Sequence, residues 1–223
     1  MTKAVLFDLD GTLLPNDEKL FAEIYFATLA RRFTKYGIKE KDFVDALNYG
    51  AMKMVYNDGK ETNETVFING LKEKLNIGVK EIDEVINDYY ENEYREAYKA
   101  LGKDIDAVKC VKLCKQKGLK VILASNPLFP KIAYLNRACY NDLKEDYFDE
   151  ITSYDLYHYA KPNPEYYKEI LSRHNLKVDE VIFFGNSQNH DINPASSIGI
   201  KSYLVHDHNS MSSKEMLDII NNI

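Results

Sequence analysis

Residues 4–12 read Ala-Val-Leu-Phe-Asp-Leu-Asp-Gly-Thr. The first four are apolar strand formers, and two carboxylates, Asp8 and Asp10, follow them. A buried strand tolerates such charges only where a cation, a proton or a substrate compensates them. Because ligands of open parallel sheets bind beyond the carboxyl ends of the strands, we expect a ligand site at Asp8 and Asp10. Taken alone, Asp-x-Asp-Gly is also compatible with a solvated turn or part of a calcium loop.

The chain has 223 residues, which suits one domain or a core that carries a smaller inserted domain. Its formal net charge is −6 with both signs interspersed, so the sequence predicts no nucleic-acid partner. No apolar run approaches the ~18 residues of a membrane span, and no signal-like segment opens the sequence. We therefore expect a cytoplasmic protein without a membrane partner. Nothing in the sequence indicates an oligomeric state.

The three cysteines are Cys110, Cys114 and Cys139. An odd number cannot all be paired within the chain, and the spacing of the first two places them on one helical face. The sequence therefore predicts reduced thiols, in preference to a disulfide framework or a metal site.

Residues 16–100 show helical periodicity and no convincing strand. Apolar residues recur at three- and four-residue intervals in four segments, which start near Leu20, Phe43, Phe67 and Ile82. This pattern predicts a bundle of four amphipathic helices. Most tyrosines of the segment fall on the apolar faces and are predicted to lie in the core. The tyrosines in question are Tyr25, Tyr49, Tyr56, Tyr89, Tyr90 and Tyr94.

From Gly102 onward, helical and strand patterns alternate, which is typical of parallel strands joined by right-handed crossovers. The predicted fold is α/β, a Rossmann-like doubly wound parallel sheet of about five strands with an inserted helical cap. The core would comprise residues 1–15 and 101–223, and the cap, residues 16–100, would cover the site as a lid. Beyond residues 4–7, we predict strands at 120–124, 148–152, 181–184 and 200–205, and helices at 105–117, 131–140, 164–174, 194–198 and 213–220.

Polar residues follow the predicted strands of the core. Ser125 and Asn126 come after the second strand, and the fourth ends in residues 185–191, Gly-Asn-Ser-Gln-Asn-His-Asp. Lys161 precedes a proline at the entry to a helix. Because the ends of parallel strands meet, we expect these groups to converge. Carboxylate and amide oxygens suit Mg²⁺, and a lysine with a hydroxyl suits a phosphoryl group, so the set predicts phosphoryl transfer.

These residues form four motifs in chain order: Asp8-x-Asp10-x-Thr12, Ser125, Lys161-Pro162, and Gly185 through Asp191. With them, the sequence resembles the haloacid dehalogenase-like superfamily, in its phosphatase type with a helical cap inserted after the first motif. The resemblance implies Mg²⁺-dependent hydrolysis of a small phosphorylated metabolite through an aspartyl-phosphate intermediate.

The resemblance also implies roles for the first motif. Asp8 would be the nucleophile, and Asp10 would protonate the leaving group and then deprotonate the attacking water. Members that cleave carbon–halogen bonds lack an acid at the second position, so Asp10 argues against dehalogenation. The hydroxyl of Thr12 would orient Asp10.

Ser125 and Lys161 would hold the transferring phosphoryl group, and Asn126 would add an amide donor. Two alternatives remain. Ser125 could instead cap the end of a strand, and Lys161 could instead be a surface lysine.

The implied Mg²⁺ ligands are Asp8, the backbone carbonyl of Asp10, Asn186 and Asp191. The superfamily generally has Asp where this chain has Asn186. An amide oxygen can still bind Mg²⁺, but one negative charge is lost. His190 is expected to face solvent or to support the metal loop, because imidazole binds Mg²⁺ poorly.

Three functions remain open from the sequence. The leading one is a phosphatase acting on a small phosphomonoester. A phosphosugar mutase is the second, and a protein that binds phosphorylated ligands without turnover is the third, favoured only by Asn186. A zinc site at His206 and His208 is disfavoured, since no third ligand lies nearby in the sequence.

Overall fold

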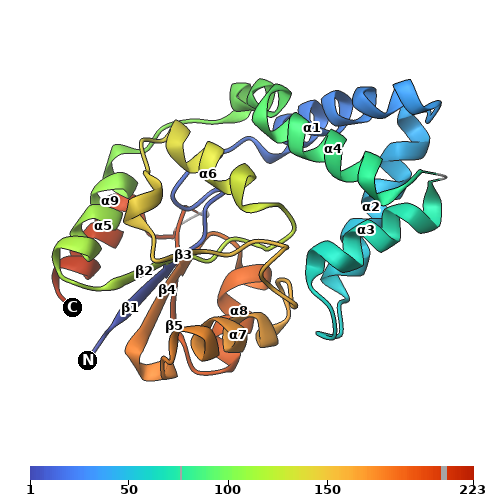
Figure 1. Cartoon of the computed structure of the whole chain (residues 1–223). Coiled ribbons are helices and arrows are strands. Elements are labelled where there is room, and N and C mark those ends of the chain that lie inside the picture. The colour runs from blue at the N-terminus through green and yellow to red at the C-terminus, as the bar shows by residue number, and fades with distance from the viewer. Residues whose placement is uncertain (76, 207–209) are drawn as a thin grey trace.

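A computed structural model describes residues 1–75, 77–206 and 210–223. Its centre is a five-stranded parallel sheet with the strand order β3-β2-β1-β4-β5 (Figure 1). The order reverses at β1, with later strands added on both sides, which makes the sheet doubly wound and confirms the predicted fold class. The strands are β1 (Ala4–Phe7), β2 (Lys120–Leu123), β3 (Glu150–Ile151), β4 (Val181–Gly185) and β5 (Lys201–Leu204).

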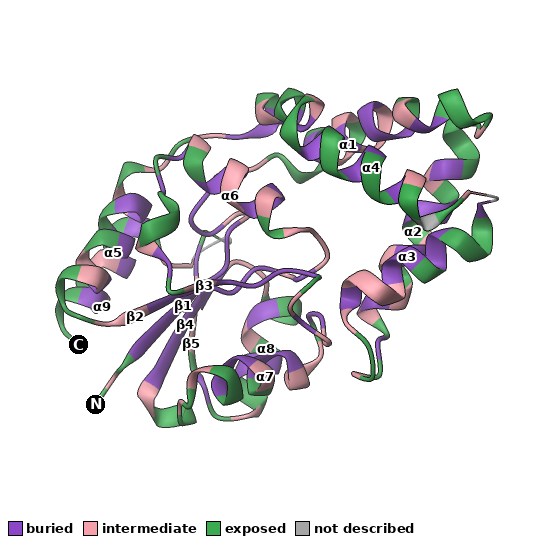
Figure 2. Cartoon of the chain, viewed as in Figure 1, coloured by how far each residue is buried: buried purple, intermediate pink, exposed green. Residues whose placement is uncertain are grey.

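The central strand β1 is buried along its whole length (Figure 2). Helices cover both faces of the sheet, which explains why the strand is a continuous apolar run without alternation. Val5 and Phe7 belong to one apolar cluster, and Leu6 belongs to another on the opposite face. Phe7 is in register with Leu123 of β2 and Phe184 of β4. The residues that follow these three strands therefore start at the same edge of the sheet.

The helices α5 and α9 lie on one side of the sheet, and α7 and α8 lie on the other (Figure 1). Side-chain caps start three of them, since Asp104, Asn163 and Ser212 accept hydrogen bonds from backbone N–H groups of the first turns. The core helices are α5 (Ile105–Gln116), α6 (Lys131–Tyr140), α7 (Pro164–His174), α8 (Asn193–Ser197) and α9 (Ser213–Asn221). Every helix predicted after Gly102 is confirmed, with ends that shift by one residue at most.

Between β1 and α5 the chain forms a helical region beside the sheet (Figure 1). The four predicted helices are confirmed as α1 (Glu18–Phe33), α2 (Glu40–Val55), α3 (Asn63–Lys74) and α4 (Val79–Glu91). The structure adds two 3₁₀ segments, η1 (Thr34–Tyr36) and η2 (Glu93–Ala100). In η2 the buried residues Tyr94, Ala97 and Ala100 recur every three positions, which matches the three residues per turn of a 3₁₀ helix.

Aromatic rings fill the interior of the helical region. Tyr25, Tyr89, Tyr90 and Tyr94 are buried and pack edge to face, as the sequence predicts for most tyrosines of this segment. The prediction that Tyr56 lies in the core is wrong, because this residue is 78% exposed. It follows the last turn of α2 as the C-cap residue and so lies beyond the face that packs.

Two neighbouring chain segments connect the helical region to the sheet. The N–H of Asp17 donates to the carbonyl of Ala100 at 2.9 Å, and the N–H of Gly102 donates to the carbonyl of Pro15 at 2.8 Å. The entry and exit of the region are thus paired side by side. The division of the chain into a core of residues 1–15 and 101–223 and a cap of residues 16–100 stays a prediction.

The start of α3 contacts the core a second time. The N–H of Asn63 donates to the carbonyl of Tyr157, and the side-chain amide of Asn63 donates to the carbonyl of Pro127 at 3.1 Å. Asn63 is fully buried and also accepts a hydrogen bond from Asn57. This polar contact fixes α3 against the loop that follows β2.

The structure also bears on the predictions for the third strand, the cysteines and a membrane span. The strand predicted at residues 148–152 is reduced to the two residues of β3, because only Glu150 and Ile151 are in register with β2, and the 3₁₀ segment η3 (Glu145–Tyr147) precedes them. Cys110, Cys114 and Cys139 are free, as predicted. None of the described helices is long and apolar enough to cross a membrane.

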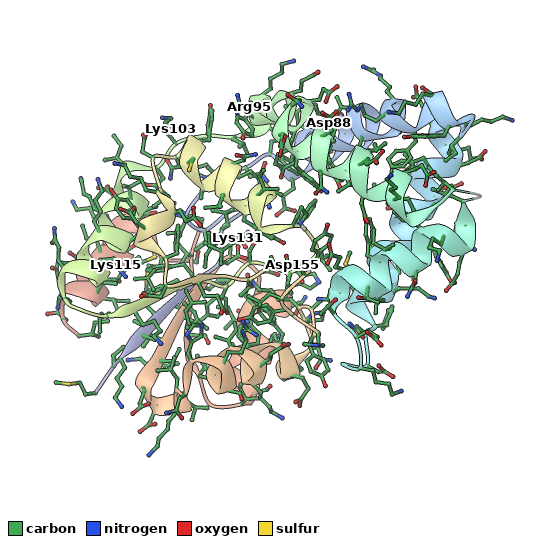
Figure 3. The ribbon with its side chains drawn as sticks, viewed as in Figure 1. Asp88, Arg95, Lys103, Lys115, Lys131 and Asp155 are labelled. Atoms are coloured by element: carbon green, nitrogen blue, oxygen red, sulfur yellow. The ribbon has the colours of Figure 1, made fainter. Side chains whose placement is uncertain are left out.

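Surface lysines of the core pair locally with carboxylates. Lys115 lies 3.0 Å from Asp149 and Lys103 lies 3.1 Å from Asp142, and both lysines lie on the outside of the molecule (Figure 3). Such pairs distribute charge of both signs over the surface. The expectation that nucleic acid is not a partner stays a prediction.

Candidate active site

An open pocket of about 200 Å³ lies where β1, β2 and β4 end. It brings together seven of the eight residues predicted from the sequence, and the eighth, Thr12, is buried. Glu18, from the first turn of α1, also contributes to the lining. The seven predicted residues are Asp8, Asp10, Ser125, Asn126, Lys161, Asn186 and Asp191.

A second cavity of similar size, about 220 Å³, lies among α1, α2, α3 and α4. Its walls are aromatic and aliphatic, with Phe21, Tyr25, Phe67 and Phe129 among them. Among the described residues, no charged side chain lines this second cavity. The polar residues of the sequence motifs lie in the first pocket.

Asp8 directly follows β1 and points its carboxylate at Lys161. Its backbone N–H continues the sheet by donating to the carbonyl of Phe184 at 2.9 Å. The Nζ of Lys161 donates to Oδ1 of Asp8 at 2.8 Å, and the hydroxyl of Thr12 lies 3.5 Å from Oδ2. The strand therefore fixes the backbone of Asp8, while Lys161 fixes one of its two carboxylate oxygens.

Lys161 is almost fully buried, with a side chain 2% exposed. Its Nζ also donates to Oδ1 of Asp191 at 2.6 Å and lies 5.3 Å from the centre of the Phe183 ring. Its backbone N–H donates to Oδ1 of Asn126 at 3.0 Å. One ammonium group thus joins two carboxylates that are far apart in the sequence.

These buried charges change the pKa values of the groups. Burial raises the pKa of Asp8 to about 7; Lys161 offsets part of this effect, and the nearby carboxylate of Asp191 adds to it. Burial alone would lower the pKa of Lys161, but the carboxylates of Asp191 and Asp8 raise it well above its usual range. The ammonium therefore stays charged between the two acids.

The loop after β4 presents Asp191 through a short π-helical segment, η5 (Gln188–Ile192). The N–H of Ser187 donates to Oδ2 of Asp191 at 3.0 Å. Gly185 makes room for this turn, because a Cβ at that position would lie 2.6 Å from the Cβ of Asp191. The loop contains no apolar periodicity, so the sequence did not predict a helical segment here.

Ser125 and Asn126 come shortly after β2 and line the same pocket. The carbonyl of Ser125 accepts hydrogen bonds of 2.7 Å from Thr152 and from Tyr166. Its hydroxyl makes no hydrogen bond to the described residues, so it can serve a ligand. The carbonyl of Asn126 accepts a hydrogen bond from the hydroxyl of Tyr134. Side chains from two helices thus hold this loop in place.

Asp10 also lines the pocket, but its partners differ from those predicted. The Nη1 of Arg137 donates to Oδ2 of Asp10 at 2.7 Å, and the side-chain amide of Asn16 donates to Oδ1 at 3.1 Å. The hydroxyl of Thr12 contacts Asp8, so the expectation that it orients Asp10 is wrong. The turn after β1 explains this, because the N–H of Thr12 bonds back to the carbonyl of Leu9.

Sequence reasoning missed Arg137, which lies on α6. The arginine is 127 residues from Asp10, but one signal was available. It falls on the apolar face of its helix, four residues after Ala133 and three after Tyr134, and all three are buried. A basic residue at such a position needs an acidic partner inside the protein.

Asn186 packs against the turn that carries Asp10. A Cβ at Gly11 would lie 2.1 Å from its Nδ2, and Gly11 has a φ of 75°. Both facts require glycine at this position. His190 is exposed and contacts Ser187 through Nδ1 at 3.3 Å, in line with the solvent-facing position expected for it. His208, one of the two histidines considered for zinc, lies outside the described residues.

The oxygen donors of the pocket suit a hard divalent cation. Asp8 and Asp191 bring two carboxylates against the single ammonium of Lys161, which leaves a negative charge for a cation to compensate. Asn186 and the backbone carbonyl of Asp10 add neutral oxygens, which Mg²⁺ accepts. No group of three His, Cys, Asp or Glu side chains in the described part of the chain has the spacing of a metal site. A donor set made of oxygens alone is the kind that Mg²⁺ prefers.

Comparison with known proteins agrees with this geometry. The model of the haloacid dehalogenase-like hydrolases matches residues 2–199. A phosphorylated carbohydrates phosphatase of Thermotoga maritima is 28% identical over 200 residues, which cover 89% of this chain and 82% of the relative.

Two solved structures are similar over nearly the whole length. A haloacid dehalogenase-type phosphatase from Thermococcus onnurineus is 20% identical, with a TM-score of 0.60 and 98% of both chains covered. A Thermotoga maritima protein with the provisional name beta-phosphoglucomutase is 25% identical, with a TM-score of 0.58 and full coverage of both chains.

The fold, the order of the four motifs and the family match define the class of this protein. The chain belongs to the haloacid dehalogenase-like hydrolases. The resemblance predicted from the motifs is thereby confirmed.

Proposed function

We propose that the chain is a Mg²⁺-dependent phosphatase that hydrolyses a small phosphomonoester through an aspartyl-phosphate intermediate. The observation that carries the proposal is the link from Asp8 through Lys161 to Asp191 at the bottom of an open polar pocket. The similarity to a phosphatase of phosphorylated carbohydrates supports the reaction class.

Asp8 is the proposed nucleophile. Its Oδ2 has one long contact, to Thr12 at 3.5 Å, whereas Oδ1 is held by Lys161. One carboxylate oxygen is therefore available to attack phosphorus while the other stays fixed, which splits a slow displacement into two faster ones. Lys161 also reduces the repulsion between Asp8 and an incoming phosphate.

Three donors are proposed to bind the phosphoryl group. The Nζ of Lys161, the hydroxyl of Ser125 and the side-chain amide of Asn126 all line the pocket. Donors that are fixed before the substrate binds stabilise the charge that develops on the phosphoryl oxygens.

Asp10 is the proposed acid and base. It would give a proton to the departing oxygen of the substrate and later take one from the water that cleaves the aspartyl-phosphate. Its position in the pocket, two residues after Asp8, supports both steps.

Mg²⁺ would be held by Asp8, the backbone carbonyl of Asp10, Asn186 and Asp191. When bound, the ion supplies positive charge that compensates the phosphate and the two carboxylates. Asn186 brings no charge to this set, so we expect weaker binding than a third carboxylate would give.

The helical region, residues 16–100, is the proposed cap, and the remaining residues form the proposed catalytic core. Glu18 reaches the pocket from the first turn of α1, which supports a role of the cap in contacting the leaving group. A pocket of about 200 Å³ suits a small phosphorylated metabolite. We also propose a cytoplasmic location, where such metabolites occur.

One observation favours a second candidate, a phosphosugar mutase. It is the similarity to the protein provisionally named beta-phosphoglucomutase. A mutase keeps the phosphoryl group on the enzyme until it returns to the sugar.

Release of inorganic phosphate from a panel of sugar phosphates and short phosphorylated acids tests the proposal. We expect turnover by the full chain with Mg²⁺, none in EDTA and none for Asp8→Asn. Isomer formation without phosphate release would favour the mutase. Binding of the same ligands without any product, in calorimetry on the wild type, would mean a binding protein and contradict the proposal.

A further inference from the structure

Asp10, the proposed acid, is bonded to a buried arginine, Arg137. Arg137 is 2% exposed, on the face of α6 that packs inward. Its Nε donates to the carbonyl of Ala133 in the same helix at 3.3 Å, and its Nη1 donates to Oδ2 of Asp10 at 2.7 Å. The guanidinium group is therefore anchored at one end and bonded to the proposed acid at the other.

The second oxygen of Asp10 is fixed as well. The side-chain amide of Asn16 donates to Oδ1 at 3.1 Å. Two donors, from different parts of the chain, thus determine how the carboxyl group of Asp10 is turned within the pocket. The carboxyl group of an aspartate can adopt several rotamers about its two rotatable side-chain bonds, so its direction depends on such partners.

Aromatic rings hold the guanidinium in place. Its central carbon lies 5.2 Å from the ring centres of Phe21 and Phe129 and 5.1 Å from that of Tyr134. The three rings come from α1, from the loop after Ser125 and Asn126, and from α6 itself. A planar guanidinium can stack on rings and donate at its edge at the same time, which a lysine cannot do.

Packing alone does not account for an arginine here. Its Nη2 is buried and has no hydrogen-bond partner among the described residues. A buried donor without a partner destabilises the folded chain, and an apolar side chain of similar size would avoid this loss. A functional role of the bond from Arg137 to Asp10 would explain why an arginine is present here despite this loss of stability.

We propose that Arg137 is a positioning residue that aims the carboxyl group of Asp10 at the leaving oxygen of the substrate. The inference rests on the proposed phosphatase function. In the first step an oxygen of Asp8 bonds to phosphorus as the ester bond from phosphorus to the leaving oxygen breaks. The electron pair of that bond stays on the leaving oxygen, which takes the proton of Asp10.

This assignment predicts a dependence on the leaving group. An alkoxide is a strong base and needs the proton as the bond breaks, whereas a nitrophenolate leaves without one. Misplacing Asp10 should therefore slow the first step for alkyl phosphates and have little effect on it for nitrophenyl phosphates. A general loss of structure would affect both classes alike.

The test compares Arg137→Met and Arg137→Lys with the wild type on an alkyl phosphate and on dinitrophenyl phosphate. Phosphorylation of the enzyme is followed in single turnovers by rapid mixing. For Arg137→Met we expect the alkyl rate to fall about 10²–10³-fold and the dinitrophenyl rate to fall less than about tenfold, with similar substrate affinity. Arg137→Lys keeps the charge and should recover part of the alkyl rate.

Arg173→Met is the matched control. Arg173 also pairs with a carboxylate, Glu150, and stacks on a ring, that of Tyr157 at 5.2 Å, but it lies outside the pocket. We expect both rates to stay near those of the wild type.

The possible results distinguish a failure of the proposed phosphatase function from a failure of the positioning role of Arg137. If the wild type hydrolyses neither substrate, the proposed function fails. If it hydrolyses both, and Arg137→Met slows both equally or speeds the alkyl substrate, the positioning role is wrong. If Arg137→Met does not fold, Arg137→Lys and Asn16→Ala replace it in the test, since Asn16→Ala removes the other donor to Asp10. For each variant, the ratio of the alkyl rate to the dinitrophenyl rate is compared with that of the wild type. An unchanged ratio in these two variants would also overturn the inference.

Discussion

The Nζ of Lys161 lies 2.8 Å from Oδ1 of Asp8, across 153 residues of sequence. Replacing the lysine by methionine should lower kcat for an aryl phosphate by about 10²–10³-fold, since it removes a fixed positive charge from the phosphoryl site. Initial rates at saturating substrate measure the loss. Lys168→Met, which removes an exposed lysine of α7 paired with Glu165, is the control. An activity within a few-fold of the wild type would contradict the role of Lys161.

Asn186→Asp should strengthen the binding of Mg²⁺. The change adds a charged oxygen to the proposed ligand set, so the Mg²⁺ concentration for half-maximal activity should fall by roughly tenfold. Asn189→Asp adds the same charge at an exposed position of the same loop and should leave that concentration almost unchanged. If the wild type is inactive and only Asn186→Asp turns over, the natural chain is not a phosphatase.

The raised pKa of Asp8 predicts a pH-dependent effect of Asp8→Asn on stability in EDTA. Between the usual value of 3.8 and about 7, the folded chain keeps a proton on Asp8 that the unfolded chain releases. The contribution of this group to stability is thus complete at low pH and is lost as the pH rises through 7. Asparagine imitates the neutral form at every pH.

The difference in Tm between Asp8→Asn and the wild type should therefore increase in favour of the variant from pH 5 to pH 8. We expect a change of about 4 °C or more, measured by calorimetry. A constant difference would show that Asp8 ionises normally in the metal-free protein.

Asn63→Ala should destabilise the contact between α3 and the loop after β2. The substitution leaves the buried carbonyl of Pro127 without its partner, and we expect a loss of about 1–3 kcal/mol in the free energy of unfolding in urea. Asn69→Ala, at an exposed position of the same helix, should change the free energy of unfolding by less than about 0.5 kcal/mol. Equal effects of the two variants would contradict the role of Asn63.

Much of the core fold is predictable from the sequence because buried parallel strands are short apolar runs. Residues 4–7 and 181–185 are of this kind, and both are strands. The strand at 148–152 was predicted too long, because pairing with β2 and not apolar character limits it to two residues. The 3₁₀ segment η2 was not predicted, because its buried residues recur every three positions and an α-helix also shows three-residue intervals.

The site was predictable to the extent that it lies at strand ends. Asp8, Ser125 and the loop before Asp191 follow adjacent parallel strands, and their convergence follows from the topology. Arg137 comes from the middle of a helix, and the sequence does not show which side of the sheet that helix covers. The partner of Asp10 could therefore be found only in three dimensions.

The paired segments around Asp17 and Ala100 have a consequence for engineering and evolution. Because the chain enters and leaves the helical region at one hydrogen-bonded bridge, the two ends of this region lie next to each other. A different insert, or a short turn, could close the same bridge without moving β1. If the helical region is the proposed cap, we expect such an exchange to change the leaving-group preference while Asp8 stays bonded to Lys161.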